Sequence, residues 1–451
     1  NTGNRNKMNA NIGINVSKKK NIIKKTPESL LDQGNKSLES NKIDEAIETY
    51  KKLLLIDRNH IQSLSNIAYC YMLKEDYKNS KNYIFRAIKI KPDNEFLQFN
   101  LGNLYKKFGK LNLALRSYNN AIKINSNIPN FKFNKSYILL KKKLYKDGWA
   151  LYDNRILAEY TNTDIYKIIK NNIYNKKLVP QNLKIIIVPE QGIGDQILFS
   201  SMYKEFIKLN PECKIVVDDR LLKIFKRSFE FKDFILESNL NKIFYYVKKK
   251  YLFIYAGSLG KFFRNNIIDF KNKPYLTDDK KISKKYQDIL LKYNKKKYIG
   301  ISWKSGSKSF LKKSFRLEDF SKLINNRDNR DIGFVNLQYG KVKQEINNFN
   351  SKNKNKIIDI QELDKFNNLD DLASLISNLD LVITVANINS NFASSLGTET
   401  WEIIHDDHEH FLYSKKQNRN CEWYDKLKIF YIKKNLNNTL SEIIKRLRNK
   451  F

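Results

Sequence analysis

The spacing of hydrophobic residues changes along the chain, from a helical period in the first third to short apolar runs further on. Segments that begin at positions 27, 61, 95 and 129 follow one another at intervals of 34 residues and share a pattern of small and large side chains. Small residues at two places let antiparallel helices approach, and a large residue fills the groove toward the next segment. The eighth, twentieth and twenty-fourth places hold Gly34, Ala68, Gly102 and Ser136; Ala46, Ser80, Ala114 and Gly148; and Tyr50, Ile84, Tyr118 and Tyr152. The pattern predicts a stack of helical hairpins over residues 27–160.

The two ends of this stack differ from its middle. The fourth segment has Lys135 and Arg155 where apolar residues are expected, and we interpret it as a cap on the stack. Residues 1–26 are polar and basic, which is typical of a disordered tail.

A strand, a glycine turn and a helix follow the hairpins. Leu183–Val188 is apolar except for Lys184, a pattern of the kind found in buried parallel strands, and it leads into the turn Pro189–Asp195. A helix at Gln196–Leu209 and a strand at Lys214–Val217 complete the unit. Open parallel sheets bind ligands at such turns, where glycine admits a ligand to the backbone and the helix start favours an anion. The alternative is a plain tight turn in which Asp195 caps the helix.

A second alternation of strands and helices begins near residue 298. It predicts two doubly wound lobes, over 161–290 and 291–451, with a hinge within Tyr275–Lys297. The predicted elements are strands at Tyr298–Trp303, Phe334–Leu337, Leu381–Val385 and, as the last, Glu399–Ile404, and helices at Leu317–Ile324, Asp370–Ser377 and Ser390–Leu396. The predicted fold class is therefore α + α/β.

Composition limits the classes of function. Among 451 residues, 84 Lys and Arg against 47 Asp and Glu give a formal net charge of +37. Lys is spread throughout the chain together with Asn and Ile, so the charge indicates anionic ligands such as nucleotide diphosphates more than nucleic acid, for which no motif is present. Cys70, Cys213 and Cys421 lie far apart, which argues against a disulfide framework. Without a signal peptide or a long apolar run, we expect a cytoplasmic protein.

The helical pattern resembles the tetratricopeptide repeat (TPR). Taken in order with the later motifs, it resembles TPR proteins whose carboxyl half is a GT-B glycosyltransferase-like domain, related to the heptosyltransferases of glycosyltransferase family 9. The motifs are Gly148–Asp153, Pro189–Phe199, Asp219–Leu222, Gly257–Gly260, Pro274–Leu276, Ile299–Trp303, Val335–Gly340, Leu379–Thr384, Ala393–Gly397 and Trp423–Tyr424. The resemblance implies two Rossmann-type lobes, with the acceptor in the first and a nucleotide-sugar donor in the second, and no metal or further cofactor.

The same resemblance assigns site residues. Asp195 matches the catalytic base, and the helix start beside it predicts that the carboxylate stays ionised. Cations that follow Trp303 are expected to offset the charge of the donor diphosphate, and backbone N–H groups of 389–391 to cap it. The predicted substrate-binding residues are Gln191, Gly192, Gly194, Ser258, Trp303, Lys304, Lys308, Lys313, Ser314, Gln338, Asn389 and Asn391. The chain departs from the family at Ala386 and Asn391, where relatives carry Asp and His.

Other functions stay open at this point. The loss at Ala386 and Asn391 favours a non-catalytic TPR interaction protein, whereas the retained glycine turn favours a transferase whose repeats present a protein or glycan acceptor. His405–His410 holds three histidines, but ligand types without a set geometry are weak grounds for a metal site, and we expect none.

Overall fold

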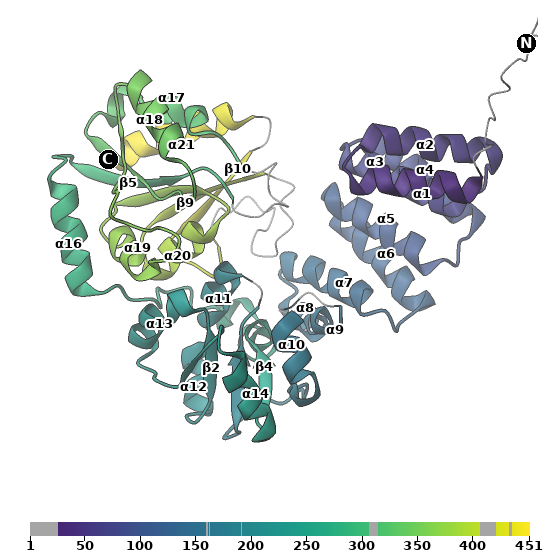
Figure 1. The fold of residues 1–451 in the computed structure, drawn as a ribbon, viewed down its shortest axis with the longest axis horizontal. Helices are drawn as coiled ribbons and strands as arrows, with labels where there is room; N and C mark the ends of the chain where they lie inside the picture. The colour runs from purple at the N-terminus through teal and green to yellow at the C-terminus, as the bar shows by residue number, and fades with distance from the viewer. Residues whose placement is uncertain are drawn as a thin grey trace, which may run out of the picture. The chain divides into compact units, whose positions relative to one another are not determined.

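The computed structural model describes residues 26–158, 161, 163–190, 192–305, 314–405, 421–432 and 435–451. They form two compact units, one ending at Asp93 and the other running from Asn94 to Phe451. Within the described ranges, no helix is long and apolar enough to cross a membrane. Helical hairpins are followed by two parallel sheets, which confirms the predicted α + α/β class (Figure 1).

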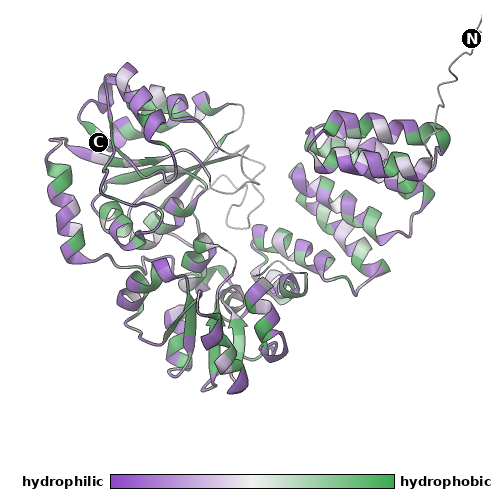
Figure 2. Cartoon of the chain, in the orientation of Figure 1, coloured by the Kyte–Doolittle hydropathy of each residue, from purple (hydrophilic) through white to green (hydrophobic). Residues whose placement is uncertain are grey.

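Helical hairpins occupy the first part of the chain. The first unit contains α1 (Pro27–Glu39), α2 (Ile43–Ile56), α3 (Ile61–Leu73) and α4 (Tyr77–Ile90). The second unit begins with α5 (Glu95–Lys107), α6 (Leu111–Ile124), α7 (Pro129–Lys141) and α8 (Tyr145–Tyr152). The side chains of Asp76 and Asn94 accept backbone N–H groups at the starts of α4 and α5, as capping residues do. The helices carry both hydrophobic and hydrophilic residues, as expected of helices that bury one face (Figure 2).

The small and large places of the repeat meet inside each hairpin. A Cβ atom at Gly34 would lie 2.4 Å from the ring of Tyr50, and one at Gly102 would lie 2.5 Å from the ring of Tyr118. Only glycine therefore allows the tyrosine ring to pack on the backbone of the facing helix. The Tyr50 hydroxyl also accepts a hydrogen bond from Asn66, in the next hairpin, at 3.2 Å. The predicted match of small and large residues is confirmed, although the ring packs within its own hairpin and its hydroxyl makes the link to the next.

The first lobe is a parallel sheet in the order β3–β2–β1–β4. Its strands are β1 (Ile185–Val188), β2 (Lys214–Val217), β3 (Phe234–Leu236) and β4 (Leu252–Tyr255). Its helices are α10 (Thr163–Ile169), α11 (Ile193–Ser200), α12 (Tyr203–Leu209), α13 (Leu222–Phe229), α14 (Leu240–Lys248) and α15 (Gly260–Phe263). Every residue of β1 is buried, as in a strand covered on both faces. The single helix predicted at Gln196–Leu209 is two helices, α11 and α12, because the chain leaves the helix at Ser201 and Met202.

The second lobe is also a parallel sheet, in the order β10–β9–β8–β5–β6–β7. Its strands are β5 (Lys297–Ser302), β6 (Ile332–Asn336), β7 (Ile357–Ile358), β8 (Leu381–Val385), β9 (Thr400–His405) and β10 (Leu427–Ile432). Its helices are α16 (Lys280–Leu291), α17 (Ser321–Ile324), α18 (Lys343–Lys352), α19 (Leu369–Ile376), α20 (Ile388–Leu396) and α21 (Leu436–Lys450). The prediction that β9 is the last strand is wrong, because β10 pairs with it along its whole length. Helix α16 occupies most of the predicted hinge.

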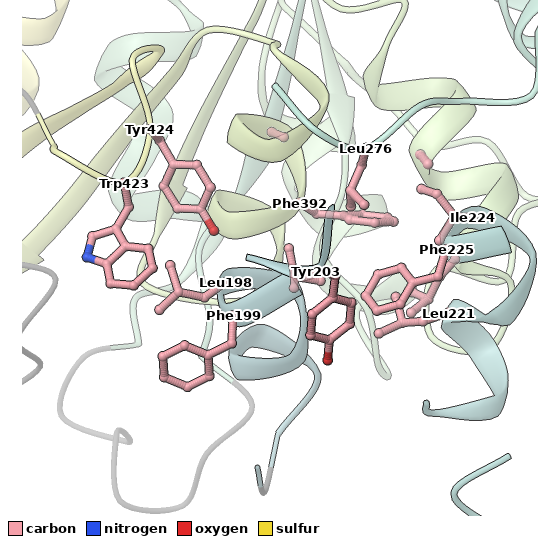
Figure 3. Close-up of a cluster of buried hydrophobic side chains, with 14 of the residues drawn as sticks. Leu198, Phe199, Tyr203, Leu221, Ile224, Phe225, Leu276, Phe392, Trp423 and Tyr424 are labelled. Carbon is pink, nitrogen blue, oxygen red and sulfur yellow. The ribbon is translucent and has the colours of Figure 1, made fainter. Parts of the chain in front are cut away.

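One hydrophobic core runs from α8 through the first lobe and into the second. Phe199 and Trp423 lie 6.2 Å apart between ring centroids, and Trp423 also packs on Trp149 of α8. The same core contains Tyr203 and Phe392, from the first and second lobes (Figure 3). The fourth repeat is therefore no cap, which would present a polar face to solvent. Its last helix instead joins the repeats to both lobes.

Candidate functional site

The glycine turn places Asp195 in the first turn of α11. Gly192 precedes this helix in an extended conformation, and Asp195 is partly buried. Burial and the neighbouring Glu190 carboxylate raise the pKa of Asp195 to about 7, against the opposing effect of Arg155. The prediction that the helix start keeps this carboxylate fully ionised is therefore wrong, because desolvation and a like charge outweigh the helix N–H groups. A pKa near neutrality suits a general base, which must accept a proton and release it.

A buried ion pair lies at the start of this turn. Arg155, in the short helix α9 (Asn154–Leu157), donates from Nη2 and Nε to the two carboxylate oxygens of Glu190, at 2.7 and 3.1 Å. Glu190 also accepts the backbone N–H of Gly257 at 2.8 Å. Ser258, a predicted ligand-binding residue, donates to Asp153 at 2.6 Å and accepts from Arg155 at 3.2 Å. Its hydroxyl is thus engaged within the protein.

The second lobe contributes the start of α20. Asn387 precedes this helix, and its side-chain oxygen accepts the backbone N–H of Asn389 at 2.9 Å, while its carbonyl accepts that of Ser390 at 3.2 Å. These two N–H groups are therefore not available to cap a phosphate, contrary to the prediction. Asn389 is fully buried and donates to Ser302 and to the Leu337 carbonyl, at 3.2 and 3.1 Å. Its Oδ1 and the Ser390 hydroxyl have no partner among the described residues.

Gln338 and Glu345 hold the loop that follows β5. The Gln338 side-chain oxygen accepts the backbone N–H groups of Trp303 and Lys304, at 2.9 and 2.8 Å. Glu345 accepts the Trp303 indole N–H at 3.2 Å and the backbone N–H of Leu317 at 2.8 Å, and it also pairs with the Lys304 ammonium. The predicted cation Lys304 thus already has a carboxylate partner. Trp303 is fully buried in the core of the second lobe, so its role is to anchor the loop.

The far end of the same loop is tied to its start. The hydroxyl of Ser314, another predicted ligand-binding residue, accepts the backbone N–H of Ser305 at 3.0 Å, and Phe315 donates to the Trp303 carbonyl at 2.9 Å. The predicted residues Lys308 and Lys313 in this loop, and Gln191 in the glycine turn, lie outside the described residues.

The glycine turn and α20 meet where the two lobes touch. A Cβ atom at Gly194 would lie 3.3 Å from Nδ2 of Asn391, which shows how closely α11 approaches α20. The Asn391 side-chain oxygen accepts the Tyr424 hydroxyl at 3.1 Å, and the Tyr275 hydroxyl lies 3.3 Å from that of Tyr424. Lys304 reaches the same end of α20, because its carbonyl accepts the Asn387 amide at 3.1 Å. The predicted turn, the start of the lysine loop and the start of α20 therefore converge.

The histidine cluster is mostly outside the described residues, which include only His405 of His405–His410. Its ring stacks on Phe315, at 5.9 Å between ring centroids. Within the described ranges, no group of His, Cys, Asp and Glu side chains is arranged to hold a metal ion.

Some functional candidates act through partners distant in sequence and were not predicted. Glu190 lies inside a predicted motif, and Glu345 and Asn387 follow predicted motifs, but their roles depend on contacts with other elements. Arg155 could have been noticed, since it stands where the repeat pattern expects an apolar residue, but this was interpreted as a feature of a capping repeat.

Residues 61–94 and 97–128 match the family model described as Tetratricopeptide repeat. The chain carries tetratricopeptide repeats. Solved TPR structures are similar to this part: MamA is 18% identical, with a TM-score of 0.28, and covers 30% of this chain and 79% of its own. YrrB, described as a TPR protein with an unusual peptide-binding site, is 21% identical, with a TM-score of 0.26. The match covers 29% of this chain and 68% of YrrB.

Two further similarities extend beyond the TPR region. Protein FlbA of Caulobacter vibrioides is 23% identical over 380 residues, which are 80% of this chain and 63% of FlbA. The chain therefore spans less than two thirds of the length of that relative. The solved structure of the glycosyl transferase family 9 protein from Veillonella parvula is 13% identical, with a TM-score of 0.43, and covers 60% of this chain and 91% of its own.

Proposed function

We propose that this chain is a metal-independent glycosyltransferase of the GT-B type, which transfers a sugar from a nucleotide-sugar to a hydroxyl of a protein or glycan acceptor. The observation that carries the proposal is the position of Asp195. It is a carboxyl group with a pKa of about 7 in the first turn of α11, one residue from the point where α11 meets the second lobe. A general base with this pKa is half ionised at neutral pH.

The proposed reaction is a single displacement. Asp195 takes the proton of the acceptor hydroxyl while its oxygen attacks the anomeric carbon of the donor sugar. The bond from that carbon to the diphosphate oxygen breaks, and the nucleoside diphosphate leaves with the electron pair. The configuration at the anomeric carbon is inverted. The repeats hold the acceptor, and the second lobe holds the donor.

The donor side rests on fewer groups than the sequence suggested. Lys304 shares its charge with Glu345, and Asn387 occupies the N–H groups of Asn389 and Ser390. Among the described residues, the side-chain oxygen of Asn389 and the hydroxyl of Ser390 are buried without a partner, and we propose them as donor contacts. Both can accept a hydrogen bond, and the hydroxyl can donate one, so they suit hydroxyl or amide groups of a sugar or base.

A second candidate function has support from the same residues. Asn391 bridges the lobes through Tyr424, and two N–H groups at the start of α20 are capped internally. A TPR scaffold whose transferase lobes no longer turn over would show these features. In either case we place the protein in the cytoplasm, with a protein partner on its repeats.

The test is a screen of nucleotide-sugars by thermal shift and calorimetry with the wild type and Asp195→Asn. The transferase proposal expects one donor to stabilise both proteins and to be hydrolysed or transferred only by the wild type. The matched control is Asp164→Asn, which replaces a solvent-exposed carboxylate on α10. If no donor binds the wild type, the scaffold is favoured.

A further inference from the structure

A buried cluster of charges joins the end of the helical repeats to the first lobe. Arg155 is 2% exposed and Glu190 is 5% exposed, and the guanidinium contacts both carboxylate oxygens. Arg155 also donates to the Tyr152 carbonyl and to Asp153, at 3.3 and 3.0 Å, and lies over the Tyr152 ring at 4.2 Å. Lys261 completes the cluster by donating to Asp153 at 2.7 Å.

Burial of two charges is costly unless their geometry is close to ideal and their remaining hydrogen-bonding groups are satisfied. Here the fork of Arg155 matches the Glu190 carboxylate, and Gly257 supplies a further N–H. A Cβ atom at Gly257 would lie 2.8 Å from the Glu190 carboxylate and 3.0 Å from the Arg155 guanidinium, so the lobe backbone closes tightly on the pair. Three hydrogen bonds from Arg155 and Gly257 fix the position of the Glu190 carboxylate.

Glu190 lies near the start of the glycine turn, five positions ahead of Asp195. A residue that fixes Glu190 therefore fixes one end of the turn, and α11 fixes the other end. Arg155 comes from the segment that directly follows the last repeat helix, α8, and Trp149 of α8 donates its indole N–H to the Arg264 carbonyl at 2.9 Å. The repeats and the turn are thus connected through buried contacts on two sides.

We propose that Arg155 and Glu190 are a positioning pair for Asp195, so that the end of the TPR array is a structural part of the candidate site. The proposal rests on the proposed function only for its effect on transfer. Its effect on Asp195 itself is measurable without any substrate. The pair acts through the placement of the turn and through the two opposite charges that it holds near the carboxyl group.

The charges around Asp195 are known from each neighbouring element. Glu190 after β1 raises the pKa of Asp195 in addition to burial, and Arg155 of α9 lowers it. Tyr152 of α8 also faces Asp195, and burial raises the pKa of this phenol far above its usual value, so it stays neutral. Asp153 and Lys261 pair with each other further along the cluster.

The experiment follows the protonated carboxyl band of Asp195 by difference infrared spectroscopy during a pH titration, with Asp195→Asn to identify the band. Glu190→Gln removes the like charge and leaves Arg155 in place, so the titration midpoint should fall by about one pH unit or more. The double variant Arg155→Met with Glu190→Gln removes both charges, and its midpoint should lie between those of Glu190→Gln and the wild type. The double variant also avoids an unpaired buried charge, so it tests the proposal even where the single variant fails to fold.

The matched control is Glu205→Gln, which breaks another, partly buried pair of the same lobe. There Arg264 donates to both Glu205 oxygens, at 3.0 and 2.9 Å, and neither residue is among the groups that act on Asp195. This control should leave the midpoint at the wild-type value. An unchanged midpoint in both the single Glu190 variant and the double variant would overturn the proposal.

Arg155→Lys separates positioning from charge. It keeps the positive charge but cannot form the two-pronged contact, so the midpoint should stay near the wild-type value. Once a donor is identified, we expect kcat to fall about tenfold or more while KM for the donor is unchanged. A kcat equal to that of the wild type contradicts a positioning role, whereas the absence of any transfer in the wild type counts against the proposed function and leaves the titration results to decide the inference.

Discussion

Asp195→Asn should stabilise the folded protein, and the gain should depend on pH. The carboxyl group is partly buried beside Glu190, and its pKa rises from 3.8 in the unfolded chain to about 7 in the folded one. Below about pH 4 both states carry the proton, so the ionisation has no effect on stability. Between about pH 4 and 7 the folded state holds the proton more tightly than the unfolded state, so the free energy of unfolding falls as pH rises. Above about pH 7 the free energy of unfolding has lost this contribution completely.

The size of the stability gain follows from the same two pKa values. The rise from 3.8 to about 7 corresponds to about 4 kcal/mol as an upper bound. Water that reaches the partly exposed side chain screens part of this electrostatic cost. We therefore expect a stability difference of about 2–4 kcal/mol between the variant and the wild type. Asparagine has nearly the same shape as a protonated aspartate and does not ionise. The variant should therefore match the wild type at about pH 4 and exceed it by that amount at about pH 8.

The measurement is urea unfolding of both proteins at about pH 4 and about pH 8, and the quantity compared is the difference in the free energy of unfolding. Asp164→Asn serves as the control, because it makes the same substitution at a solvent-exposed carboxylate. A difference between Asp195→Asn and the wild type that does not change with pH would refute the reasoning. The raised pKa would then not exist, and Asp195 would be an ordinary ionised residue at the helix start.

Three further predictions concern packing. Gly102→Ala should destabilise the protein by about 1–3 kcal/mol, because its Cβ would press on the Tyr118 ring, and Tyr118→Leu in the same chain should recover most of the loss in thermal unfolding. Tyr424→Phe leaves the Asn391 oxygen without its donor and should cost about 1–3 kcal/mol; equal stability by urea unfolding would show that this link between the lobes is unimportant. Gly397→Ala should cost about 1–2 kcal/mol by the same assay, because φ there is +87°; a neutral result would contradict the left-handed end of α20.

The periodic parts of the fold were predictable from sequence because their causes are local. The strand predicted at Leu381–Val385 is found with the same bounds, since a run of apolar residues between polar turns requires no knowledge of its partners. Strand β10 was missed, although the residues that follow Lys428 are as apolar as the runs that were predicted. The ammonium of that lysine reaches Glu399 at 3.2 Å, a contact that the local pattern does not show.

The site was predictable in outline and not in its electrostatics. The glycine turn indicated where Asp195 would lie, but its pKa depends on Glu190 and Arg155, and the latter is 40 positions away in sequence. Lys304 was expected to be a free cation, and its partner Glu345 comes from a different helix. Charges that come together only in three dimensions determine the protonation of a site, and a pattern along the chain does not contain that information.

The central claim is that Asp195 is the base of a sugar transfer at the meeting point of the lobes. The most direct measurement is the release of nucleoside diphosphate from the donor that binds the wild type, compared between the wild type and Asp195→Asn at equal donor occupancy. We expect turnover to fall by about a hundredfold or more in the variant, with donor affinity retained. Equal turnover in the two proteins would contradict the claim.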